Sequence, residues 1–178
     1  MTMPALLGPV ASEHEDLLAD LAQRRDLLRL SIQGLTHEQS TATPTISGLS
    51  LAGLIKHAAH TERRWIAGGI GQREVPASRA DAVAFGLEAG ETLADVIGFY
   101  AAVADETESI VGGLVDLGER VRVPGWLAPV HAGYWSVRSV LLHVIDETAS
   151  HARAADLIRP IVDRTRPRAP LRLAPRSA

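Results

Sequence analysis

The chain has 178 residues, enough for one domain with a sizeable core and too few for two comfortable ones. Hydrophobic residues make up 46% and aromatic residues only 4%, a composition that favours closely packed helices over a β-sandwich or a disordered chain. The net charge of −3 is unevenly distributed: residues 164–178 are rich in Arg, whereas residues 1–163 contain 13 basic and 21 acidic residues. This acidic main part of the chain argues against nucleic acid as the main partner.

The N-terminal stretch "MTMPALLGPV" has neither a basic start nor a long apolar segment, so we expect no signal peptide. Nothing in the sequence approaches the roughly eighteen unbroken apolar residues that a membrane span requires. We therefore expect a cytoplasmic protein that does not contact membranes.

Two amphipathic helices are predicted in the first part of the chain. In residues 12–32, Ser12 and Glu15 form a capping-box pattern, and leucines recur at helical spacing while Arg24, Arg25 and Arg29 are expected on the solvent side. The second predicted helix begins near Ser50 and stops at the glycine pair 68–69.

The third predicted helix has Thr92 as its cap and ends at the glycine pair 112–113. Residues 118–135 contain Pro124 and Pro129, which would interrupt a ladder of strands, so we expect a long ordered loop there. The fourth predicted helix is the longest, with Ser136 as its cap and Pro160 expected to stop or kink it.

Four amphipathic helices without a convincing strand predict an all-α fold, a four-helix bundle with a long loop between the third and fourth helices. We expect residues 1–163 to form this single domain. Residues 164–178 alternate Arg with Pro, which predicts a flexible C-terminal tail.

The segment "HVIDETASH" places His143, Glu147 and His151 four residues apart on the fourth predicted helix. All three cannot easily share one metal ion, because the two histidines are about 12 Å apart along the helix axis. Either His143 with Glu147 or Glu147 with His151 could chelate, and geometry alone does not choose between the pairs. A surface i,i+4 pair is the alternative without a metal.

The second predicted helix offers His57 and His60, three residues apart. His57 lies among Leu and Ala and is expected to point inward, whereas His60 lies nearer the polar side. An inward imidazole from one helix and a carboxylate–imidazole pair from another is a common way for bundles to build a metal site. A hydrogen-bonded core histidine is the alternative explanation for His57.

The segments "GLSLAGLIKHAAHTERRW", "VPGW" and "SVRSVLLHVIDETASHARAADLIR" resemble the DinB/YfiT-like superfamily of bacterial metalloproteins, closest to the actinobacterial branch related to mycothiol-dependent enzymes. The resemblance covers residues from about 12 to 163. It implies a divalent metal, with zinc or nickel favoured and manganese or iron as further candidates, and a homodimer as a further expectation.

The resemblance also implies a ligand set of His57, Glu147 and His151, which makes His60 and His143 neighbours of the site. Relatives often carry a histidine at the position of Ala154 and an acid at that of Pro160. These two departures bear on the shape and polarity of the pocket, and therefore on the substrate and on activity.

The function that follows is a metal-dependent S-transferase for a low-molecular-weight thiol such as mycothiol and a small electrophilic substrate. The sequence contains no cysteine, so the reacting sulfur must come from the substrate. Arg153 and Arg138 could bind an anionic group of a substrate, or could be surface arginines. A metal-binding bundle without catalytic activity and a metal-dependent hydrolase are the alternatives.

Overall fold

The computed structural model describes residues 12–75, 86–122 and 133–164. The described part is mostly helical, which confirms the all-α prediction. Its elements are α1 (Glu13–Leu30), α2 (His37–Thr41), α3 (Leu51–Arg63), the π-helical segment η1 (Arg64–Ile70), α4 (Leu93–Gly112), β1 (Arg120–Arg122), β2 (Tyr134–Ser136) and α5 (Val137–Arg164).

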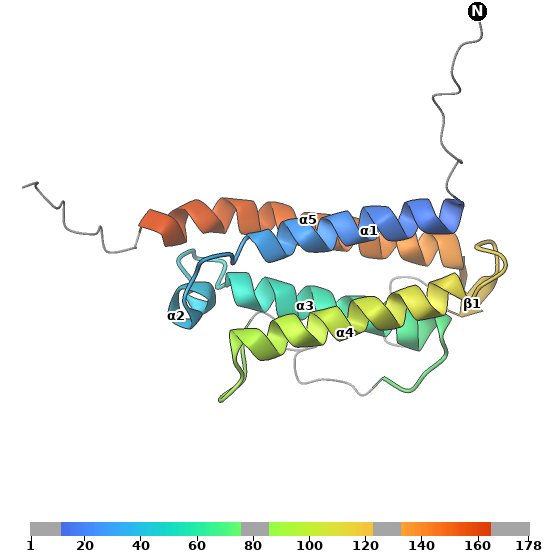
Figure 1. Cartoon of the computed structure of the whole chain (residues 1–178), viewed down its shortest axis with the longest axis horizontal. Coiled ribbons are helices and arrows are strands. Elements are labelled where there is room, and N and C mark those ends of the chain that lie inside the picture. Colours follow the sequence, from blue (N-terminus) through green and yellow to red (C-terminus); the bar gives the residue numbers. More distant parts are fainter. Residues whose placement is uncertain (1–11, 76–85, 123–132, 165–178) are drawn as a thin grey trace, which may run out of the picture.

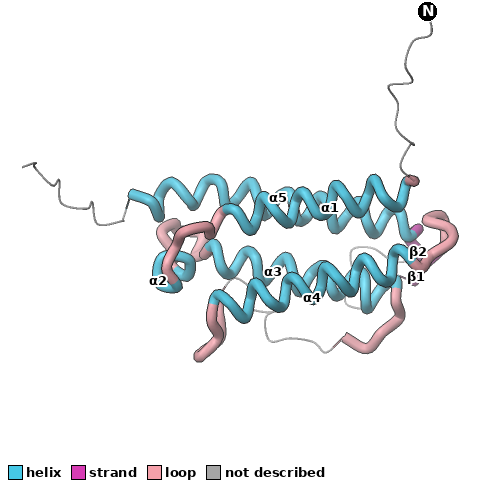
Figure 2. The backbone as a smooth tube through the Cα atoms, viewed as in Figure 1, coloured by secondary structure: helices cyan, strands magenta, loops and turns pink. Residues whose placement is uncertain are grey.

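The four long helices form two layers. Figure 1 shows α1 beside α5 in one layer and α3 beside α4 in the other. The two helices of the first layer run in the same direction, since Arg138 near the start of α5 pairs with Glu13, and Arg159 near its end donates to the carbonyl oxygen of Ser31 at 2.7 Å. Helices α3 and α4 are also parallel, since Lys56 pairs with Glu91 and Arg63 with Glu106. Helix α3 therefore ends, and α4 begins, at opposite ends of the bundle (Figure 2).

The predicted helix starts are confirmed by their capping hydrogen bonds. Ser12 and Glu15 form a reciprocal capping box at α1, and Thr92 forms one with Asp95 at α4. At α5, the Ser136 hydroxyl accepts a hydrogen bond from the Ser139 N–H at 3.1 Å. These short-range contacts satisfy backbone N–H groups that have no partner within the helix.

The cap of α3 is the buried Ser50, whose hydroxyl accepts from the Gly53 N–H at 3.1 Å. We expect Ser50→Ala to lower the free energy of unfolding by about 1 kcal/mol, because an N–H group at the helix start loses its acceptor. Chemical denaturation measures this change. Ser47→Ala is the matched control: Ser47 is exposed and bonds to Thr45, so its loss should change stability by less than about 0.5 kcal/mol. Equal effects of the two substitutions would contradict the capping role.

One prediction about chain breaks was wrong, and half of another. Arg120–Arg122 and Tyr134–Ser136 form an antiparallel pair where we expected only a loop. This ladder is possible because it is short and lies outside the segment that contains Pro124 and Pro129, both beyond the described residues. Of the two effects expected at Pro160, the stop does not occur, because helix α5 continues to Arg164. Because Pro160 has no N–H group, the backbone carbonyl of Asp156 lacks its usual helical hydrogen-bond donor. Both residues are exposed, so water can donate to that carbonyl instead.

The second predicted helix also extends further than expected. It passes through the glycine pair 68–69 as the π-helical segment η1 and ends at Ile70. A π-helical turn widens the helix locally and is often found near functional sites. The segment packs its buried Trp65 and Ile66 against α5, in one of two apolar clusters that fill the bundle.

One residue on α1 was placed on the wrong side of the helix. We expected Arg25 at the solvent side, but its side chain is only 2% exposed. Its Nε and Nη2 atoms donate to both oxygens of the buried Glu62 carboxylate on α3, at 3.0 and 2.7 Å. The Thr107 hydroxyl on α4 also donates to Glu62, at 2.6 Å. A buried polar cluster thus connects three helices at the centre of the bundle.

Within the described ranges, no helix is long and apolar enough to cross a membrane. The cytoplasmic location stays a prediction. The predicted tail began at residue 164, but Arg164 is the last residue of helix α5. The remainder of that tail, residues 165–178, and the "VPGW" segment lie outside the described residues.

Candidate metal centre

The three residues of the predicted ligand set lie together between α3 and α5. His57 comes from α3, Glu147 and His151 come from α5, and one potential ligand atom of each lies within 4.8 Å of the others. The two imidazole rings meet nearly at right angles, at 82°, with their centroids 4.8 Å apart. The His151 Nε2 atom lies 3.6 Å from a carboxylate oxygen of Glu147.

Small residues allow the two helices to bring these side chains together. Ala58 and Ala59 on α3 and Ala152 and Ala155 on α5 are buried in one apolar cluster. Methyl side chains at a helix contact permit a short distance between the axes. The imidazoles of His57 and His151 are therefore opposite one another rather than separated by bulky side chains.

The cluster combines a shielded imidazole with a more open carboxylate. The His151 side chain is 14% exposed and that of Glu147 is 40% exposed. Burial lowers the pKa of His151, because a desolvated imidazole disfavours the charged form. At neutral pH the ring is therefore neutral, which is the state that binds a metal.

Thr61 is a neighbour of the cluster that was not expected from the sequence. Its hydroxyl lies 3.4 Å from His57 Nε2, one helical turn further along α3. Histidines that bind metals usually hydrogen-bond through the other ring nitrogen, which fixes the tautomer and orientation of the ring. The i,i+4 spacing from His57 was the available signal, but many threonines have such a neighbour.

The structure places His143 and His60 against aromatic residues and not in the cluster. The His143 ring lies 4.7 Å from the ring of Trp65 and 5.6 Å from that of Trp135, and the two indoles are stacked. The His60 ring lies 4.7 Å from that of Phe99 on α4. Of the two pairs that helical spacing allowed, Glu147 with His151 is thus the one that joins His57.

The two arginines proposed as substrate contacts have partners on the protein surface. Arg138 pairs with Glu13 through two hydrogen bonds. Arg153 is exposed and donates to the Ser150 hydroxyl at 2.9 Å. These contacts fit the surface alternative, and the role of either arginine in substrate binding stays a prediction.

The donor set fits a divalent transition metal. Two neutral imidazoles and a carboxylate are ligands that zinc, nickel, manganese and iron accept in proteins. A facial set of three protein ligands leaves coordination positions open, as in catalytic rather than structural sites. Fold and donors together define a class, the helical bundles with a candidate metal site between two helices.

The chain belongs to the mycothiol-S-transferase family, whose model matches residues 16–164. This family is part of the DinB/YfiT-like superfamily, so the resemblance expected from the sequence is confirmed. The chain is also similar in structure to a conserved protein from Enterococcus faecalis, with a TM-score of 0.69 and 12% sequence identity. That match covers 86% of this chain and 99% of the other, and it supports the fold alone. A comparison with curated proteins finds no significant match.

Proposed function

We propose that this protein is a divalent-metal-dependent S-transferase that joins a low-molecular-weight thiol, such as mycothiol, to a small electrophile. The observation that carries the proposal is the cluster of His57, Glu147 and His151 in a chain of the mycothiol-S-transferase family. Zinc or nickel is the proposed metal, with manganese or iron as further candidates.

In this proposal the three side chains hold the metal and leave one side of the site accessible. When bound, the ion supplies positive charge that lowers the pKa of a thiol at an open position. His151 is more shielded than Glu147, whose partly exposed carboxylate marks the open side. The chain has no cysteine, so the thiol substrate provides the sulfur. Its proton passes to solvent, and the sulfur forms a bond to the electrophilic carbon as the leaving group departs with its electron pair.

The proposal predicts thiol-conjugating activity that depends on the metal. Metal-loaded protein, mycothiol and a fluorogenic electrophile should give conjugate faster than the same mixture with chelator-treated protein. Hydrolysis of the electrophile without thiol would replace the proposal with a hydrolase. Neither reaction in protein with stoichiometric metal would leave a metal-binding bundle without catalytic activity.

Thr61 should affect metal affinity if it orients His57 as a ligand. We expect Thr61→Val to weaken metal binding by roughly tenfold or more, because the imidazole loses the hydroxyl that orients it. Thr61→Ser retains the hydroxyl and should restore most of the affinity. Competition titration against a metal-chelating dye measures both variants without an activity assay. The role would be refuted by equal affinity of the valine variant and the native protein.

A further inference from the structure

A second pocket lies between α1 and α4, outside the metal cluster. It has a volume of about 620 Å³ and is lined by the end of α1, the turn that follows it and the first part of α4. The candidate metal ligands come instead from α3 and α5. The volume falls in the usual range of small-molecule sites. The proposed S-transferase function gives this pocket no role.

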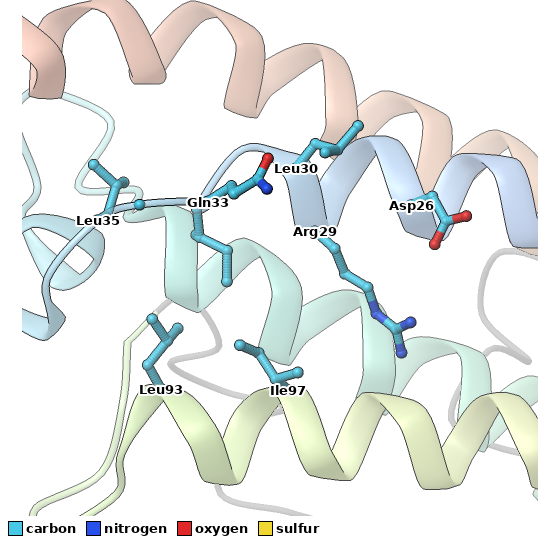
Figure 3. A pocket seen from close by; sticks show the side chains of 9 residues that line it. Asp26, Arg29, Leu30, Gln33, Leu35, Leu93 and Ile97 are labelled. Atoms are coloured by element: carbon cyan, nitrogen blue, oxygen red, sulfur yellow. The ribbon is translucent and has the colours of Figure 1, made fainter.

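The walls of the pocket are largely apolar and partly open to solvent. Figure 3 shows Leu93 and Ile97 of α4 pointing toward α1, from which Arg29 extends toward α4. Leu30 also lines the pocket, but its side chain points away from α4. Leu30 is 56% exposed and Ile97 is 37% exposed, although both are large apolar side chains. A ligand with an apolar body would remove this surface from water, which is favourable in proportion to the area covered.

Arg29 supplies a positive charge and N–H groups that do not donate to any described residue. Its guanidinium lies above the Tyr100 ring, 5.4 Å from the centroid. Its Nε and Nη2 atoms are shielded from solvent and have no hydrogen-bond partner among the described residues. The same edge of Arg25, one turn earlier, donates to both oxygens of the Glu62 carboxylate. The Nε–Nη2 edge is the part of an arginine that matches a carboxylate.

The charge around Arg29 limits what the pocket accepts. Asp26 lies one turn before Arg29 and lines the same pocket. A ligand with a carboxylate at each end would place the second one against the apolar walls, where a charge is costly to bury, whereas a ligand with a single negative charge can pair with Arg29 alone. We propose that the α1–α4 pocket binds an amphipathic monocarboxylate, with its carboxylate on Arg29 and its apolar body against Leu30, Leu93 and Ile97.

Calorimetric titration of the full chain with octanoate tests this proposal. Octanol and octanedioate are matched probes, the first without charge and the second with an additional one. We expect one saturable site for octanoate and at least roughly tenfold weaker binding of both other probes. Octanol loses the hydrogen bonds between two charged groups, and octanedioate places a second charge against apolar side chains. Carboxylates also bind metals, so His151→Ala is titrated in parallel, and octanoate should bind to it unchanged.

Substitutions locate the site. Arg29→Gln should weaken octanoate binding by roughly 10- to 100-fold. The control Arg24→Gln, at a position that pairs with Asp20 and does not line the pocket, should leave binding unchanged. Ile97→Trp should block the opening of the pocket and so prevent octanoate from binding. If Arg29→Gln fails to fold, the Ile97→Trp variant provides the test of the site. Absence of a saturable site, equal binding of octanoate and octanol, loss of binding in His151→Ala, or unchanged binding in both pocket variants would overturn the proposal.

Discussion

Alanine at His151 or at His57 is expected to remove the bound metal while the helices remain. Each substitution deletes one of three protein ligands, and two remaining ligands hold a divalent ion far more weakly. We expect the metal affinity to fall by more than roughly 100-fold. Loss of a group that only orients a ligand typically lowers the affinity by about 10- to 100-fold, and loss of the ligand itself should lower it further. The far-ultraviolet circular dichroism spectrum should be unchanged, because the apolar clusters that hold the bundle are intact.

Each of these substitutions has a matched control on its own helix. His143→Ala on α5 and His60→Ala on α3 remove imidazoles that pack on aromatic rings outside the cluster. Both controls should keep a stoichiometric metal ion by elemental analysis. Full metal content in His57→Ala or in His151→Ala would refute the assignment of that residue as a ligand. Loss of metal in the controls as well would show that the assay reports on general destabilisation.

Glu62→Ala is expected to cause the largest loss of stability. The substitution removes the carboxylate that hydrogen-bonds to the guanidinium of Arg25, at a site where both side chains are at most 2% exposed. The remaining carboxylate near Arg25 is that of the exposed Glu108, 3.8 Å away, which cannot replace the two lost hydrogen bonds. Removing one partner of a buried ion pair typically costs about 3–5 kcal/mol. For a chain of this length, that corresponds to a fall in Tm of about 6–20 °C, measured by thermal denaturation. Added salt should change this difference little, because buried charges are weakly screened.

Two further variants separate the buried pair from ion pairs in general. Arg138→Ala breaks the exposed pair with Glu13, and we expect no measurable change in Tm, since solvent screens that interaction. The double variant Arg25→Met with Glu62→Leu removes both charges and should be more stable than Glu62→Ala alone. A double variant no more stable than the single one would show that the cost arises from packing and not from an unpaired charge.

The error on Arg25 shows where the sequence pattern contained more than we inferred. Leu21, Arg25, Leu28 and Ile32 follow one another at spacings of three and four, so Arg25 lies on the buried side of α1. Its charge suggested solvent, but its partner Glu62 lies 37 residues away on another helix. A pattern within one helix cannot reveal that partner.

The sequence by itself determined the four long helices, their starts and one half of the candidate metal centre, but not the short helix α2 (His37–Thr41). Capping boxes, apolar spacing and the i,i+4 pair of Glu147 and His151 are all contacts within a few residues of the chain, so residue order fixes them. The tertiary structure decided the rest. It brought His57, rather than His60 or His143, to that pair, it paired the two short strands β1 and β2, and it buried Arg25 against Glu62. These contacts join residues that are far apart in the sequence. They depend on how the helices pack against one another, which the pattern within a single helix does not determine.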